Sequence, residues 1–165
     1  MYLSGSCTHR LDEQKRIIFP SKYREALGET LYISKGLGGC LFVYGEDEWG
    51  KIIRKMHKNV KTEDDLNKTR VKLEQTLSVI PDKQGRVTLT DELISFADLN
   101  TEKDNVKING YYQRVEIWSA AKYGEKVKKS AESEDKNKVD ESQIGLYDID
   151  DDEQGATPLA SRENK

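Results

Sequence analysis

The pattern of apolar and polar positions predicts two copies of one structural unit along the chain. In the first copy, β-branched and aromatic runs bounded by turn residues predict three strands, "RIIFP" (16–20), "TLYIS" (30–34) and "CLFVY" (40–44). Between the first two runs, "SKYREAL" predicts a short helix that ends at Gly28. After the third, "EDEWGKIIRKMH" places its apolar residues at helical spacing, at Trp49, Ile52, Ile53 and Met56.

The second copy repeats this order. "GRVTL" (85–89) predicts a strand, "TDELISFADL" (90–99) a helix capped by Thr90, and "VKING" (106–110) with "RVEIW" (114–118) a hairpin. Ser119 is placed to cap a final short helix. Between the copies, "TEDDLNKTRVKLEQTL" (62–77) opens with a capping box of Thr62 and Asp65, which predicts a linking helix.

The register of the duplication supports two related units. A shift of 70 residues places Asp12 and Arg16 on Asp82 and Arg86, and a shift of 74 places Tyr44 on Trp118. A longer loop around "NTEKDN" explains the difference. Each unit has roughly 45 residues, near the lower limit for independent folding. We therefore expect the two units to bury their apolar faces against each other or against other chains.

The chain divides into four segments by these patterns. We assign a first repeat to 3–50, a linking helical segment to 51–76, a second repeat to 77–123, and a short helix followed by a disordered tail to 124–165. The overall net charge is -3, but residues 124–165 carry -5 and residues 1–123 carry +2. A mildly basic body with an acidic tail indicates a nucleic-acid or membrane partner.

Nothing in the sequence indicates an enzyme. The histidines, His9 and His57, form no HExxH motif, and no other metal-ligand spacing is present. "GLGG" lacks the Lys-Ser/Thr of a phosphate loop, and no G-x-S-x-G occurs. We therefore expect no catalysis, no cofactor, no metal and no small-molecule substrate. No run of apolar residues is long enough for a membrane span or an export signal, which favours a cytoplasmic protein.

Basic residues concentrate at equivalent places in the two copies. Arg10, Lys15, Arg16, Lys22 and Arg24 lie around the first strand and helix, and Lys83 and Arg86 lie at the second turn. A purely structural explanation exists, because an Asp can cap the backbone amides of a turn and an Arg can pair with it. Repetition favours a functional role, since two basic loops at a fixed spacing suit a duplex whose grooves repeat about every 34 Å.

Four motifs give a specific resemblance over residues 3–123. They are the G-x-x-x-H-x-L-D pattern of Gly5, His9, Leu11 and Asp12, "GCLFVYGEDEW" (39–49), "DKQGR" (82–86) and "RVEIWS" (114–119). In this order the sequence resembles the MraZ family of AbrB-like swapped-hairpin DNA-binding proteins. The resemblance implies an α+β fold in which two tandem β-α-β-β repeats interlock as a pseudo-dimer within one chain.

The same resemblance implies a role. Such proteins form rings, bind direct repeats of DNA upstream of their own cell-division and cell-wall operon, and regulate its transcription at the nucleoid. The D-x-x-x-R motif carries DNA binding. We accordingly expect Arg16 and Arg86 to contact DNA and Asp12 and Asp82 to organise the turns. The further DNA contacts that we expect are Lys15, Lys83, Arg10, Lys22 and Arg24.

The sequence departs from the family pattern at Lys15, and it also allows an alternative function. Lys15 stands where the family usually has glycine, and lysine is a poor occupant if that position needs a positive φ. The first loop is then expected to bend differently from the second. The alternative to a regulator is an oligomeric scaffold whose basic loops hold an acidic partner or the acidic tail of the chain. We assign His9, Tyr23, Trp49 and Trp118 to packing rather than to DNA contacts.

Overall fold

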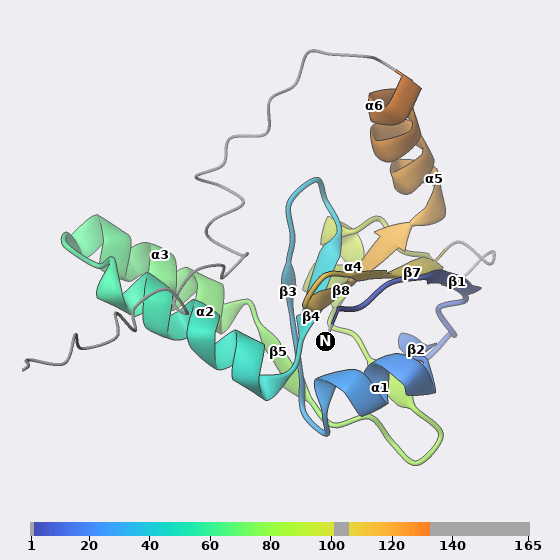
Figure 1. The fold of residues 1–165 in the computed structure, drawn as a ribbon, viewed down its shortest axis with the longest axis horizontal. Coiled ribbons are helices and arrows are strands. Elements are labelled where there is room, and N and C mark those ends of the chain that lie inside the picture. The colour runs from blue at the N-terminus through green and yellow to red at the C-terminus, as the bar shows by residue number, and fades with distance from the viewer. Residues whose placement is uncertain (1, 101–105, 133–165) are drawn as a thin grey trace, which may run out of the picture.

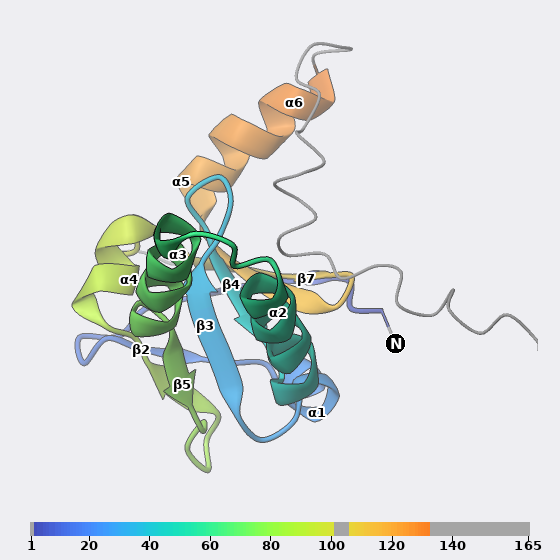
Figure 2. The same ribbon diagram turned by 90° about the vertical axis from the view of Figure 1, so that its left-hand side faces the viewer.

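The computed structural model describes residues 2–100 and 106–132. The first half runs through β1 (Ser6–His9), β2 (Arg16–Ile18), α1 (Ser21–Leu27), β3 (Leu31–Lys35) and β4 (Leu41–Tyr44). Two longer helices, α2 (Glu46–Lys58) and α3 (Glu63–Glu74), then lie side by side next to the sheet (Figures 1 and 2). The second half runs through β5 (Leu77–Val79), β6 (Arg86–Thr88), α4 (Asp91–Phe96), β7 (Val106–Tyr111) and β8 (Arg114–Ser119).

The chain continues beyond the second half as a helical segment that projects from the sheet (Figure 1). It consists of α5 (Ala120–Tyr123), a π-helical turn (Gly124–Lys128) and α6 (Lys129–Glu132). Its first turn is capped by Ser119, whose hydroxyl accepts a hydrogen bond from the Lys122 amide, as the sequence predicted.

The main sheet is antiparallel and combines strands from both halves. Its order is β1-β7-β8-β4-β3-β5, so counting inward from either edge meets equivalent strands of the two copies. The first strand of each half pairs with the hairpin of the other half, because β1 lies beside β7 and β5 lies beside β3. Neither half could therefore form its part of the sheet without the other.

A separate two-stranded ribbon joins the halves a second time. Strands β2 and β6 are antiparallel, and the central pair is Ile17 with Val87. Two further backbone hydrogen bonds tie each strand to the turn of the opposite copy: the Phe19 amide donates to Gly85 O at 2.8 Å, and the Leu89 amide donates to Lys15 O at 2.8 Å.

Alternation along the central strands buries both faces of the sheet. Leu41 and Val43 of β4 face the main core, which also contains Ile17 and Val87 of the ribbon. Phe42 of β4 faces the opposite side, where the indole of Trp49 and the other apolar residues of α2 cover the sheet. This double coverage explains why every residue of "LFVY" is buried.

Several local predictions are confirmed. Helix α1 has the predicted bounds, and Gly28 after it has a φ of 96°. The capping box at the start of α3 forms between Thr62 and Asp65. Tyr23 is buried, and its hydroxyl donates to Gly5 O at 2.8 Å. Trp49 and Trp118 both belong to the core beneath α2.

Two strands were not predicted. Each half begins with a short strand, β1 or β5, before the β-α-β-β order that the sequence indicates. Both strands lie at the sheet edges and are partly exposed, so they lack a strong apolar pattern. We predicted disorder from residue 130, but residues 130–132 form the end of helix α6. The rest of the predicted tail and most of the "NTEKDN" loop lie outside the described residues.

Candidate nucleic-acid interface

Two turns with the same hydrogen-bond geometry precede the ribbon strands. In the first, Oδ1 of Asp12 accepts hydrogen bonds from the amides of Gln14 and Arg16, both at 2.9 Å. Oδ2 of the same carboxylate accepts from Nε of Arg16 at 2.8 Å. A short sequence of five residues therefore fixes both its own backbone and the base of the arginine side chain.

The second turn repeats this geometry. Oδ1 of Asp82 accepts from the amides of Gln84 and Arg86, both at 2.9 Å, and Oδ2 accepts from Nε of Arg86 at 2.6 Å. The ion pairs leave 28% of the Arg16 side chain and 34% of the Arg86 side chain exposed. Each arginine is thus held at Nε while its side chain stays partly exposed, and Nη2 of Arg16 also donates to Oε1 of Gln14 at 2.5 Å.

The carboxylates are ionised well into the acidic range. Burial disfavours the charged form of Asp12, but the hydrogen bonds from the Arg16 backbone and side chain outweigh it and lower the pKa of Asp12 below its ordinary value. At Asp82, the hydrogen bond from the Arg86 backbone is the largest cause of the lowered pKa. Since both groups are anions at neutral pH, each pairs with its arginine as a full charge.

The left-handed position of the turn is the same in both copies. Lys15 has a φ of 61° and Gly85 has a φ of 79°. The expectation that the first loop bends differently is wrong, because Lys15 N donates to Asp12 O at 3.0 Å as Gly85 N does to Asp82 O at 2.8 Å. The hydrogen bonds of the turn hold Lys15 in a conformation that disfavours a Cβ.

The register of the ribbon places both arginines on one surface. Arg16 lies opposite Thr88, and Arg86 lies opposite Ile18, while the central residues Ile17 and Val87 point into the core. Diagonal neighbours of this kind have their Cβ atoms roughly 7–8 Å apart. The expected match of the two loops to a groove repeat of about 34 Å is therefore wrong for one chain. The arginines instead fall within the width of one major groove, about 12 Å.

The other basic candidates lie around this surface in different settings. Arg10 and Lys83 are exposed, and Lys83 lies at the tip of the second turn. Lys15 forms an exposed ion pair with Asp91. Lys22 is exposed on α1, with Nζ at 4.6 Å from the centre of the Tyr23 ring. These side chains belong to the segments before and after the ribbon strands rather than to the strands themselves.

Arg24 differs from the other candidates because it supports the second turn. Its Nε donates to Phe19 O at 3.1 Å. Its guanidinium covers Gly85, since a Cβ at that glycine would lie 2.9 Å from Cζ of Arg24. The side chain thereby fixes the position of the turn that carries Arg86.

Two residues on this surface were missed in the sequence. Ile18 and Thr88 lie exposed on the outer face of the ribbon, each opposite an arginine. Alternation in "RII" could have predicted Ile18, because Ile17 is buried and its neighbours must then point outward. Their position relative to the arginines depends on the pairing of β2 with β6, which no local pattern reveals.

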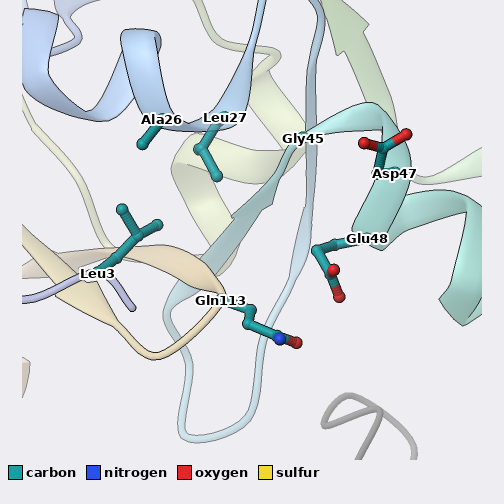
Figure 3. A pocket seen from close by; sticks show the side chains of 7 residues that line it. All are labelled: Leu3, Ala26, Leu27, Gly45, Asp47, Glu48 and Gln113. Atoms are coloured by element: carbon teal, nitrogen blue, oxygen red, sulfur yellow. The ribbon is translucent and has the colours of Figure 1, made fainter. Parts of the chain in front are cut away.

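A cleft of the described residues lies elsewhere. It has a volume of about 200 Å³ and opens between the end of α1, the start of α2 and the β7–β8 turn (Figure 3). Its lining combines apolar Leu3 and Leu27 with acidic Asp47 and Glu48. Carboxylates repel phosphate, and none of the basic candidates lines this cleft.

Two other kinds of site are absent from the described residues. Within residues 2–100 and 106–132, no group of three or more His, Cys, Asp or Glu side chains is arranged to hold a metal ion. In the same ranges, no helix combines the length and the apolar character needed to cross a membrane.

Comparison with known proteins gives consistent matches. Residues 2–71 and 73–144 match the family model described as "MraZ protein, putative antitoxin-like". A protein of Clostridium acetobutylicum named "Transcriptional regulator MraZ" is 37% identical over 145 residues, which cover 86% of this chain and 98% of the relative. A protein of the same name from Caldanaerobacter subterraneus subsp. tengcongensis is 42% identical, over 71% of this chain and 80% of the relative. Another, from Clostridium tetani, is 38% identical over 73% of this chain and 84% of the relative.

Proposed function

The chain belongs to the MraZ family, and from this premise we propose that it is a transcriptional regulator that binds double-stranded DNA through the outer face of the β2–β6 ribbon. The observation that carries the proposal is the pair of fixed arginines on that face. A two-stranded ribbon is one of the few elements that fit the major groove. Arg16 and Arg86 lie on adjacent strands of this ribbon, so both can enter the same groove.

The aspartates support this role by preorganising the arginines. An exposed arginine loses considerable side-chain freedom when it binds a ligand, and that loss weakens binding. Here the bond from Nε to Asp12 or Asp82 already fixes each side chain. The fork of a guanidinium can then take the O6 and N7 atoms of guanine, or a phosphate, with its outer edge.

The flanking cations supply contacts that do not depend on base sequence. Lys15, Lys22, Lys83 and Arg10 are exposed in segments that adjoin β2 or β6 along the chain and are proposed to contact phosphates. Arg24 contributes indirectly through the second turn. Each phosphate neutralised by such a side chain releases counterions, so the affinity should fall steeply with salt.

The strand exchange, the assembly of chains and the DNA target are proposed from the family resemblance. We propose that the strand exchange between the halves is the swapped-hairpin arrangement of AbrB-like proteins. We further propose that several chains form a ring and bind direct repeats upstream of the operon that encodes them, at the nucleoid in the cytoplasm. A ring raises the effective concentration of each ribbon near neighbouring repeats, which strengthens binding that is weak for one chain.

The test is DNA binding by arginine variants. The full chain is titrated against duplexes that tile the DNA upstream of its own gene, with a duplex of shuffled sequence for comparison. Arg16→Ala and Arg86→Ala should each weaken specific binding by about tenfold or more, because a bidentate contact to a base is lost. Circular dichroism and the melting temperature should remain close to those of the wild type.

Arg70→Ala is the matched control. Arg70 is an exposed arginine on α3 that bonds only locally, to Asn67, so its removal deletes the same charge away from the ribbon. This variant should bind DNA almost as the wild type does. Normal specific binding by a well-folded Arg16→Ala, Arg86→Ala double variant would contradict the proposed function.

A further inference from the structure

An exposed isoleucine lies beside both arginines of the ribbon. Ile18 is directly opposite Arg86 and two residues along the same strand from Arg16. Its side chain is 52% exposed, although the preceding Ile17 is fully buried. A single exposed apolar side chain is common on protein surfaces. This one lies on the proposed DNA-binding face, next to both arginines.

The equivalent position in the second copy holds a different residue. The ribbon has an approximate twofold relationship through the pair of Ile17 and Val87, which exchanges Arg16 with Arg86 and Ile18 with Thr88. Each side of the ribbon therefore presents one arginine, while the side chain opposite each arginine differs. A symmetric surface reads a palindrome, whereas this one presents a larger apolar group on one side only.

The chemistry of the major groove determines what such a group can recognise. The edges of the base pairs in that groove offer hydrogen-bond donors and acceptors, and their apolar group is the C5-methyl of thymine. Residues directly opposite in an antiparallel pair have Cβ atoms about 4.5–5.5 Å apart. Since bases along one strand are about 3.4 Å apart, Ile18 reaches a base one or two positions from the base held by Arg86.

We propose that Ile18 is a specificity-determining residue that packs against the C5-methyl of a thymine one or two base pairs from a guanine held by Arg86. Thr88 presents only a small methyl beside its hydroxyl at the equivalent position. The two halves of the chain therefore read different base pairs, and one ribbon recognises a site that has a direction. This inference rests on the proposed function and deepens it.

The test removes the methyl group from the DNA and the isoleucine from the protein. In the tightest-binding duplex of the tiling series, each thymine is replaced in turn by deoxyuridine, which lacks only the C5-methyl. Wild-type affinity should fall about three- to tenfold at one thymine in each bound repeat, consistent with the loss of a buried apolar contact. Ile18→Ala should bind the unmodified duplex more weakly by a similar factor.

The decisive readout is the coupling between the two changes. Ile18→Ala should be insensitive to deoxyuridine at the thymine to which the wild type responds. Ile80→Ala is the control, because Ile80 is also exposed, at 60%, but lies outside the ribbon; this variant should keep the wild-type response. Melting temperatures of both variants should match that of the wild type, since neither side chain is buried.

Failure of this inference can be told from failure of the proposed function. If the wild type binds and the arginine variants do not, but no deoxyuridine position matters, then Ile18 reads no methyl and this inference alone is overturned. Undiminished sensitivity of Ile18→Ala to deoxyuridine overturns it in the same way. If the wild type selects no duplex at all, the proposed function fails and this inference fails with it.

Discussion

Lys15 and Gly85 occupy the same position in two equivalent turns, and both have a left-handed backbone with φ of 61° and 79°. Their amides and carbonyls make matching hydrogen bonds, including the bonds that tie each turn to the strand of the opposite copy. The geometry of the turn is therefore set by Asp12 or Asp82 and the ribbon rather than by the residue at this position. Substitutions at the two positions should therefore affect stability in opposite ways: Lys15→Gly should keep or raise it, and Gly85→Ala should lower it.

Replacing Lys15 by glycine should separate stability from DNA binding. A left-handed non-glycine residue costs about 1–2 kcal/mol, and glycine costs about 0.5–1 kcal/mol in unfolded-state entropy. The ion pair with Asp91 is exposed and contributes little. Lys15→Gly should thus leave the free energy of unfolding unchanged or raise it by up to about 1 kcal/mol. DNA affinity should fall, with a salt dependence shallower by about one phosphate contact.

Lys83→Gly provides the comparison for that variant. It removes a charge from the tip of the second turn, where the backbone is not left-handed. The loss of DNA affinity should be similar, but no gain in stability is expected. A clear drop in the denaturation midpoint of Lys15→Gly would contradict the idea that Lys15 is held in an unfavourable conformation.

Gly85→Ala should destabilise the second turn. The added Cβ meets an unfavourable φ, which costs about 1–2 kcal/mol. It would also lie 2.9 Å from Cζ of Arg24 and push the guanidinium away from Phe19 O. Urea denaturation of Gly85→Ala, Arg24→Ala and the double variant measures the coupling. The glycine substitution should cost less when Arg24 is already alanine, and equal costs in both backgrounds would show that the two side chains do not clash.

Much of the fold could be predicted because each copy carries strong local signals. The bounds of α1 follow from a helix-forming run that ends at Gly28, and α3 follows from the capping box at Thr62. Strands β1 and β5 could not be predicted in this way. They are short, half-exposed edge strands whose stability comes from pairing with the hairpin of the other half.

The DNA contacts proposed from the sequence stay a prediction, but the structure adds how the candidate residues are arranged. Repetition of the D-x-x-x-R motif identifies Arg16 and Arg86 from the sequence alone. Their separation depends on the register of β2 with β6, which brings together residues about 70 positions apart. The same pairing brings Arg24 against the second turn and Ile18 opposite Arg86, so neither relationship could be predicted from local sequence.

Deleting residues 133–165 tests whether the acidic tail competes with DNA. That segment carries a net charge of -6, while residues 1–132 carry +3. If the tail occupies the basic ribbon face, its deletion should strengthen DNA binding severalfold at low salt. The difference should vanish near 1 M salt, where charges are screened over about 3 Å. Anisotropy titrations at several salt concentrations provide the measurement.

Neutralising the acidic residues of one segment tests which part of the tail competes with DNA. Replacing the acidic residues of the 148–153 segment, "DIDDDE", by their amides removes most of the net negative charge of residues 133–165 without shortening the chain. It should strengthen DNA binding nearly as much as the deletion does. Unchanged DNA affinity of both variants at low salt would rule out tail competition, and with it the scaffold hypothesis in which the basic loops hold the tail.

Lys72 makes stability depend on pH. Burial, and secondarily the charge of Lys35, lowers the pKa of Lys72 from 10.5 to about 8. Below pH 8 the lysine is charged in both states, so the folded protein bears the full cost of burying the ammonium. Between about pH 8 and 10.5 the unfolded state binds more protons than the folded state, and stability therefore rises with pH.

Lys72→Met should remove this dependence. At pH 7 the variant should be more stable by roughly 1–2 kcal/mol, somewhat less than the pKa shift implies because the hydrogen bond from Nζ to Lys35 O is also lost. Its advantage should shrink as the pH rises from 8 to 10. Denaturant titrations across this range measure the difference. Lys68→Met, at an exposed lysine one turn earlier in the same helix, should show no such trend. A constant difference between Lys72→Met and the wild type at all pH values would mean that Lys72 has no lowered pKa.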